Sequence, residues 1–136
     1  MRFSERMAPL DLGPPHAGIL RAIGASEGMS QKALAELLGI VPSRLVELLD
    51  ELGERGLVER RDDEEDRRVY ALHLTRKGVH ALQAIGRVAE EHQQALLAAL
   101  TPDERATLAS LLRRVADQQG LVPGVHPGYA RLGRKR

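Results

Sequence analysis

Residues 57–74 predict a β-hairpin whose tip is entirely charged. The first strand extends from Leu57 to Arg61, and the second, from Val69 to Leu74, alternates with Tyr70, Leu72 and Leu74 on one face. The residues between them, 62–68, read DDEEDRR. Because strand-like segments lie on both sides of it, the charged tip is expected to project from the rest of the protein on a two-stranded ribbon.

Two predicted helices directly precede the hairpin. Ser30 is positioned to cap the first, which Gly39 ends, and Pro42 begins the second, which ends near Gly56. Each carries leucines at helical spacing, so each has one apolar face. A helix pair with a glycine in the short turn indicates a helix-turn-helix, although taken alone it fits a plain core hairpin as well. The order helix, helix, hairpin is much more specific and predicts a winged helix-turn-helix.

Further helices are expected on both sides of this unit. Thr75 is positioned to cap a long helix, and Thr101 to Glu104 form a capping box that opens the last one. A short helix over Phe3 to Leu10 and another from Pro14 to about Gly24 precede the pair. The tail after Gln119 is rich in glycine and proline, carries four basic residues and no acid, and is expected to be irregular.

Composition agrees with a mainly helical protein. Only 2% of the residues are aromatic while 43% are hydrophobic, so aliphatic side chains fill the core and favour helices packed on helices. The formal charge of +1 argues neither for nor against nucleic acid, because local distribution decides that question. The absence of cysteine excludes disulfides and thiolate chemistry. No apolar run is long enough to span a bilayer, and the N-terminus lacks the pattern of a signal peptide, so we expect a cytoplasmic protein.

The winged-helix segment resembles the MarR family of bacterial transcriptional regulators. The resemblance rests on DELGERGLVERR, on Asp66-Arg67-Arg68 in the wing, and on Leu74-Thr75 followed by Gly78. The later stretch LTPDERATLASLLRRV resembles the family's segment at its last helix, so that the resemblance covers about residues 3–118. It implies a mainly α fold with a small β-hairpin wing and a helical dimerisation region.

The resemblance also implies partners. The family forms homodimers through its terminal helices, binds double-stranded DNA, and releases it when a small molecule, often aromatic and anionic, binds between the two parts. The expected organisation is one domain over residues 1–136, with a DNA-binding lobe over 13–76, dimerisation segments over 1–12 and 77–120, and an irregular basic tail over 121–136. The family's first helix is usually much longer, and here only about its last ten residues exist. No cofactor is expected.

In the wing, the resemblance assigns Arg68 to the DNA minor groove. A guanidinium suits that groove because it is planar, permanently charged and weakly hydrated. Asp66 would orient Arg68 through a charge-assisted hydrogen bond, and Arg67 would contact a phosphate or be the inserted residue itself. At the wing base, one of Arg60 and Arg61 is expected to point to phosphate and the other to the acid run. The alternative is a charged hairpin turn without a DNA contact.

The second helix of the pair would enter the major groove with its N-terminus foremost. Arg44 can donate two hydrogen bonds to guanine, worth about 1–3 kcal/mol of discrimination. Ser43 can bond a base edge or a phosphate, and Glu47 is expected to face solvent. The start of the preceding helix suits a phosphate, although Ser30 can act as a cap alone. The predicted DNA contacts are Ser30, Gln31, Lys32, Pro42, Ser43, Arg44, Arg61, Asp66, Arg67 and Arg68.

Other kinds of site are not expected. No two histidines have the spacing of a helical metal site, and the sequence has no phosphate loop or nucleophile elbow, so neither a metal site nor an enzyme is predicted. His16 lies on the helix that faces the family's ligand pocket and could bond an anionic effector, or could simply be a partly exposed polar residue.

The sequence therefore predicts a dimeric, ligand-responsive transcriptional repressor that binds an inverted-repeat operator. The alternative is a winged-helix protein-interaction module in which the wing and the tail contact a protein instead of DNA.

Overall fold

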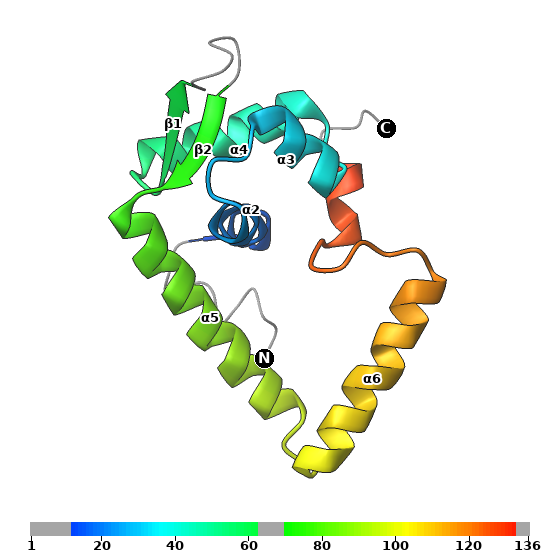
Figure 1. Ribbon diagram of the computed structural model, residues 1–136. Coiled ribbons are helices and arrows are strands. Elements are labelled where there is room, and N and C mark those ends of the chain that lie inside the picture. The colour runs from blue at the N-terminus through cyan, green and yellow to red at the C-terminus, as the bar shows by residue number, and fades with distance from the viewer. Residues whose placement is uncertain (1–11, 63–69, 133–136) are drawn as a thin grey trace.

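The computed structural model describes residues 12–62 and 70–132 of the chain (Figure 1). Three helices come first, followed by an antiparallel pair of strands, two long helices and a short 3-10 helix. In chain order the elements are α2 (Pro14–Ala25), α3 (Gln31–Leu38), α4 (Pro42–Glu54), β1 (Val58–Asp62), β2 (Tyr70–Leu74), α5 (Arg76–Leu96), α6 (Pro102–Gln118) and η2 (Pro127–Arg131).

Helix ends follow the capping signals in the sequence. The Ser30 side chain accepts a hydrogen bond from the Ala33 N–H and starts α3, which ends at Gly39 with a φ of 66°. That left-handed conformation is the one glycine adopts without a steric penalty. Thr101 and Glu104 form the reciprocal capping box at the start of α6. These short-range contacts confirm the predicted helix starts.

The hairpin β1–β2 is the predicted wing. Its register pairs Val58 with Leu74, Arg60 with Leu72, and Asp62 with Tyr70. Leu72 is fully buried, whereas Tyr70 is 48% exposed near the open end of the ribbon. Figure 1 shows the hairpin extending from the unit formed by α2, α3 and α4. We call these three helices and the hairpin together the winged-helix lobe.

One aliphatic core holds the winged-helix lobe together. Each of its three helices contributes leucine or isoleucine side chains with almost no exposed surface, and Leu57 and Leu72 join them from the hairpin. The fully buried large side chains are Ile19, Leu20, Ile23, Leu34, Leu45, Leu48, Leu49, Leu52 and Leu72. Burying each of them contributes about 1.5–3 kcal/mol, so α4 is fixed firmly against α2 and α3.

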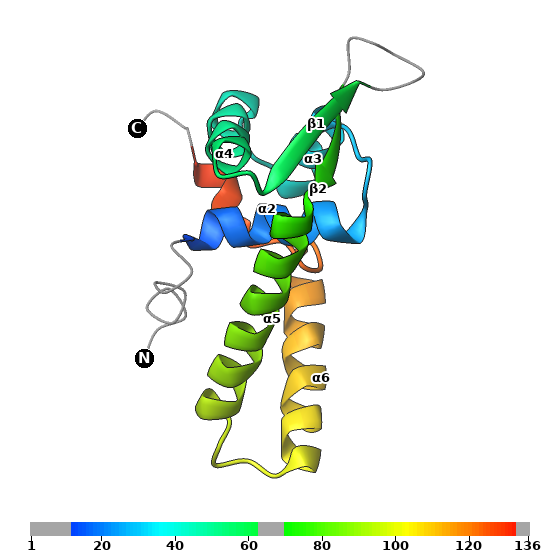
Figure 2. The same ribbon diagram turned by 90° about the vertical axis from the view of Figure 1, so that its left-hand side faces the viewer.

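Of the last two long helices, α5 packs against this core over part of its length and α6 lies outside it. Helix α5 leads away from the winged-helix lobe and α6 runs back toward it, so that the two form a V in Figure 1 and extend from the lobe in Figure 2. Ile85 of α5 reaches the core, but none of the residues of α6 is buried. Within the part of the chain that the structure describes, α6 therefore has no buried face.

The predicted fold class is confirmed, with one difference in the tail. The mainly helical chain carries a single two-stranded hairpin among its described residues. The predicted helix over Phe3 to Leu10 lies outside the described residues. The tail was expected to be irregular, yet it contains η2 and buries Tyr129 against the winged-helix lobe. In the described part of the chain, no helix is long and apolar enough to cross a membrane.

Candidate nucleic-acid interface

Helices α3 and α4 present their N-terminal ends at the surface of the winged-helix lobe. Pro42 and Ser43 are exposed in the first turn of α4, and Lys32 is exposed in the first turn of α3. The buried leucines lie on the opposite face of α4. The predicted contact residues of the two helices are therefore at the surface, and the free N–H groups of an exposed helix start suit a phosphate.

Arg44 is held at this surface by an ion pair within α4. Its Nη1 lies 2.7 Å from Oε2 of Glu47, and the two side chains are 33% and 63% exposed. Glu47 was expected to face solvent, and it does, but it also holds the guanidinium. Because an exposed pair of this spacing contributes only about 0.3–0.5 kcal/mol, a DNA base or phosphate can displace Glu47.

The wing tip lies beyond what the structure describes. Asp66, Arg67 and Arg68 fall within residues 63–69, outside the described residues. At the base of the wing, Arg60 pairs with Asp50 of α4 at 2.9 Å, and Arg61 pairs with Glu59 at 3.0 Å.

The pairing of Arg61 follows from strand geometry. Side chains two residues apart in a strand share a face, which brings the exposed Arg61 beside Glu59. The described partners of Arg60 and Arg61 are thus Asp50 and Glu59, and residues 63–66 of the acid run lie outside the described residues. Arg61 remains a predicted phosphate contact.

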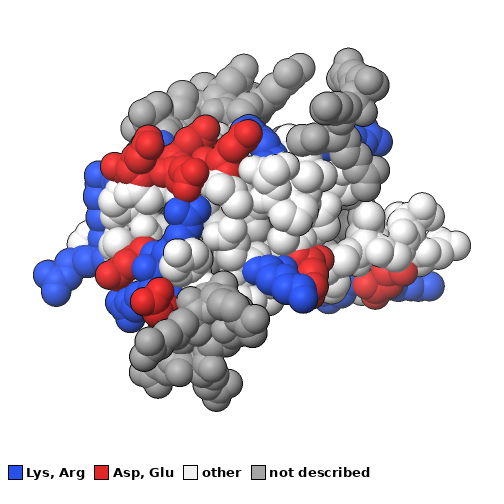
Figure 3. Space-filling model, turned by 90° about the horizontal axis from the view of Figure 1, so that it is seen from above, with Lys and Arg blue, Asp and Glu red and all other residues white. Residues whose placement is uncertain are grey.

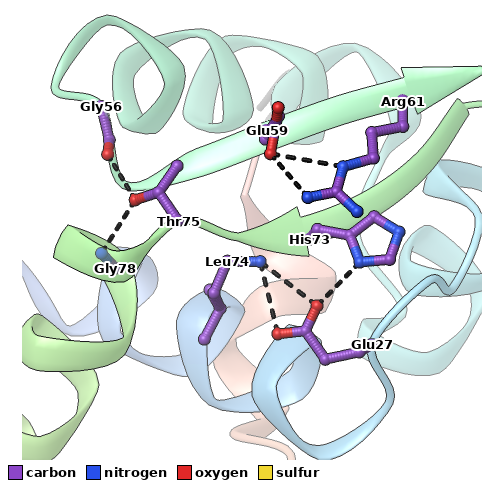
Figure 4. A network of polar contacts seen from close by, with 8 residues as sticks. All are labelled: Glu27, Gly56, Glu59, Arg61, His73, Leu74, Thr75 and Gly78. Atoms are coloured by element: carbon purple, nitrogen blue, oxygen red, sulfur yellow. Dashed lines mark hydrogen bonds and ion pairs between the residues drawn. The ribbon is translucent and has the colours of Figure 1, made fainter.

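A polar network fixes the hairpin relative to the helices (Figure 4). Glu27, in the turn between α2 and α3, accepts hydrogen bonds from the Leu74 N–H and from Nδ1 of His73, the latter at 3.0 Å. The Thr75 hydroxyl donates to the Gly56 carbonyl at 2.6 Å and accepts from the Gly78 N–H at 3.0 Å. These contacts join the wing to α2, α4 and α5, so the wing base has one defined orientation.

On the face seen from above in Figure 3, acidic side chains form a group at upper left, and lysine and arginine side chains are scattered around it. Helix α4 itself carries four acids, of which Asp50 pairs with Arg60 and Glu51 with His16. No broad basic surface covers the described part of this face. Affinity for DNA would therefore depend on individual arginines, as the near-neutral net charge already indicated.

A cavity of about 830 Å³ lies between the winged-helix lobe, α5 and the tail. Its lining is mostly apolar, with Arg21, His126 and Tyr129 as its charged or titratable members. The lining residues are Pro14, Pro15, Ala17, Gly18, Arg21, Leu82, Ile85, Gly86, Ala89, Gly124, His126, Gly128, Tyr129 and Leu132. A volume of this size is typical of a small-molecule site.

His16, the predicted effector contact, is not among the described residues that line this cavity. Its Nε2 lies 2.6 Å from Oε2 of Glu51 on α4. Helix α2 turns Pro15 and Ala17 toward the cavity and His16 between them toward α4, since successive helical residues point about 100° apart. Within the described residues, no cluster of three or more histidine, aspartate or glutamate side chains could hold a metal ion.

The chain is similar to known regulators over most of its length. Residues 10–69 match the MarR family. A transcriptional regulatory protein assigned to the hcr operon of Thauera aromatica is 38% identical over 106 residues, which are 78% of this chain and 64% of that protein. The chain thus spans less than two thirds of the length of that relative.

Two solved structures share the fold. Wild-type MarR from E. coli, in its apo form, has a TM-score of 0.76 and 30% identity, over 83% of this chain and 84% of that one. The transcriptional repressor CouR, bound to a 23-mer DNA duplex, has a TM-score of 0.75 and 35% identity, over 84% of this chain and 81% of that one. With the matching winged-helix segment, this agreement shows that the chain belongs to the MarR family, and the relatives to which it is similar are transcriptional regulators.

Proposed function

We propose that the chain is a homodimeric repressor that binds an inverted-repeat operator and releases it when a small molecule occupies the cavity. The observation that carries this proposal is the exposed N-terminus of α4, which a fully buried leucine face and the anchored wing hold in one orientation. In the proposed complex Arg44 and Ser43 contact the major groove, while Ser30, Gln31, Lys32 and Arg61 contact phosphates. Arg68, with Asp66 and Arg67, supplies the minor-groove contact.

An apolar face on α6 supports the homodimer. Leu111, Leu112 and Val115 are 50%, 59% and 55% exposed, and with Leu108 they follow the spacing of one helical face. Exposing a contiguous apolar stripe of this kind to water is unfavourable, so the stripe marks an interaction surface. In a symmetric dimer each stripe packs against its own copy, and binding to two half-sites then requires the two α4 helices to lie one DNA turn, ~34–36 Å, apart.

The dimer prediction is tested by adding a charge to this stripe. Leu112→Asp is expected to raise the dimer dissociation constant at least about a hundredfold, because each symmetric interface loses two leucine burials of about 1.5–3 kcal/mol. Multi-angle light scattering should then find monomers, and operator binding should fall with them.

Ser110→Asp is the matched control. It adds the same charge on the opposite face of α6 and should leave the dimer intact, since Ser110 is exposed and lies outside the stripe. If the Leu112→Asp protein stays dimeric and binds DNA as before, α6 is not part of the dimer interface.

The lining of the cavity supports a ligand with an apolar body and an anionic end. Arg21 supplies a permanent positive charge. Nδ1 of His126 accepts a hydrogen bond from the Gly128 N–H at 2.9 Å, so in the neutral ring the proton is on Nε2, where it can be donated to an anion. The apolar lining from α2 and α5 would hold the rest of the ligand.

A gel-shift titration with the region upstream of the coding sequence tests the function as a whole. We expect binding that prefers this DNA over random duplex and weakens steeply with salt, because phosphate contacts release counterions. Arg68→Ala should weaken binding sharply while circular dichroism stays unchanged. Equal affinity for random DNA at every salt concentration would instead favour a winged-helix protein-interaction module.

A further inference from the structure

The C-terminal segment 125–132, which we call the tail anchor, is packed into the winged-helix lobe. After α6 the chain returns to the lobe, where η2 lies close to α3 (Figure 1). Tyr129 is only 4% exposed and belongs to the core cluster, and Val125 and Leu132 pack against that cluster. The tail anchor thus buries one side chain and partly buries two more on a lobe that already has its own core.

The hydroxyl of Tyr129 is tied to the start of α2. It donates a hydrogen bond of 2.6 Å to the Pro15 carbonyl, 114 residues away in the chain. Burial raises the pKa of Tyr129 to about 12, so the hydroxyl keeps its proton and remains a donor at any physiological pH. The hydrogen bond therefore fixes the orientation of the Tyr129 ring, which is also buried.

Helix α2 has a notch that fits this ring. A Cβ at Gly18 would lie 2.1 Å from the Tyr129 hydroxyl oxygen and 3.1 Å from the ring carbon that bears it. Glycine in a helix interior is otherwise unfavourable relative to alanine. Gly18 is therefore the residue that lets the tail anchor approach α2.

The tail anchor also makes one side of the cavity. His126, Gly128, Tyr129 and Leu132 line it, opposite the residues from α5. Without this segment the space between α2 and α5 would be an open surface groove with less apolar lining. The enclosed part of the cavity depends on Tyr129 staying in its notch.

We propose that the tail anchor is a latch that completes the cavity, so that a small molecule with an apolar body and an anionic group binds only when Tyr129 is docked against Gly18. The proposal rests on the proposed role of the cavity as an effector site. Because coupling between two equilibria is reciprocal, a ligand that needs the docked latch must also stabilise it. The latch would then set effector affinity without contacting DNA.

A double-mutant cycle tests whether the latch docks in this way. With Tyr129 present, Gly18→Ala should lower the melting temperature by at least about 4 °C, because the new methyl group displaces the ring. In a Tyr129→Ala background the same change should raise the melting temperature by about 2–4 °C, since alanine is the better helix former and the space is free. Gly18→Ala that stabilises both backgrounds would overturn the docking of Tyr129.

Calorimetry with 2-naphthoate, an apolar ring system with one carboxylate, tests the cavity. Gly18→Ala and Tyr129→Phe should each weaken its binding about tenfold or more, the second variant keeping the ring but losing the bond to Pro15. Tyr70→Ala, which removes an exposed tyrosine on β2, is the control and should bind as the wild type does.

The remaining outcomes are also decisive. Unchanged naphthoate affinity in both latch variants would show that the tail anchor is not part of the site. No binding to the wild-type protein at millimolar concentration would overturn the ligand class. Neither result bears on operator recognition, which the gel shift measures without naphthoate.

Discussion

Arg44→Ala is expected to weaken operator binding at least about thirtyfold. A bidentate contact to guanine contributes about 1–3 kcal/mol, and a homodimer makes that contact twice. Because Arg44 is partly exposed and its partner Glu47 is exposed, removing the guanidinium leaves no buried charge unpaired, and the fold should tolerate the change. Fluorescence anisotropy with the operator and with a scrambled duplex at one salt concentration measures the effect. Loss of affinity for the operator alone identifies a base contact, whereas an equal loss for both identifies a phosphate contact.

Two variants bracket this result. Glu47→Gln removes the charge that holds the Arg44 guanidinium 2.7 Å away and should increase DNA affinity about two- to fivefold. Arg87→Ala removes an exposed arginine from α5 and should leave affinity unchanged. If Arg44→Ala leaves DNA affinity unchanged, as Arg87→Ala is expected to do, Arg44 does not contact the major groove.

Gly78→Ala is expected to lower the free energy of unfolding by about 2–3 kcal/mol or more. A Cβ at Gly78 would lie 2.0 Å from the carbonyl oxygen of Leu57, which is backbone and cannot rotate away. The same carbonyl accepts a hydrogen bond from the Thr75 N–H at 3.1 Å, so moving it breaks the junction of β1 and α5. Since this junction orients the wing, DNA affinity should fall together with stability.

Gly86→Ala is the matched control in the same helix. Gly86 is exposed, and a Cβ there would meet nothing within 4 Å. Alanine should therefore stabilise α5 by about 0.5–1 kcal/mol through its higher helix propensity. Urea unfolding of both variants gives the comparison. Changes of the same sign at positions 78 and 86 would show that the contact with Leu57 does not constrain the fold.

Much of the fold could be predicted from the sequence because its signals are local. The N-caps Ser30, Thr75 and Thr101 each accept a hydrogen bond from a residue three positions on, so a short window of sequence contains the whole interaction. The wing was predicted in the same way, from a short strand-like segment and an alternating one on the two sides of a charged tip. The resemblance to the MarR family also pointed to Gly78, and the structure gives the reason in the carbonyl of Leu57.

The contacts that position the site are not local and were missed. Glu27 reaches His73 and Leu74 across 46 and 47 residues, and no short pattern in the sequence indicates either pairing. Tyr129 lies in a stretch whose glycines and prolines indicated an irregular tail, and its partners are Pro15 and Gly18 in the first described helix. The pairing of Arg44 with Glu47 could have been found, because the two are three residues apart in a helix.

The cavity illustrates the same limit. His16 was a candidate effector contact because it lies on the helix that faces the family's ligand pocket, with a partly exposed polar residue as the alternative. Its neighbours Pro15 and Ala17 line the cavity while His16 pairs with Glu51. Arg21, one turn further along α2, is the basic residue of that helix that lines the cavity. The choice between them required knowing where α4, α5 and the tail pack.

The central claim is that two copies of the chain place Arg44 and the wing on adjacent grooves of one duplex. Native mass spectrometry of the protein with its inverted-repeat operator, and with a duplex that keeps only one half of the repeat, tests this directly. We expect two chains on each full operator and at least about a hundredfold weaker binding to the half-site duplex. Single chains bound to the full operator, with the same affinity for both duplexes, would contradict it.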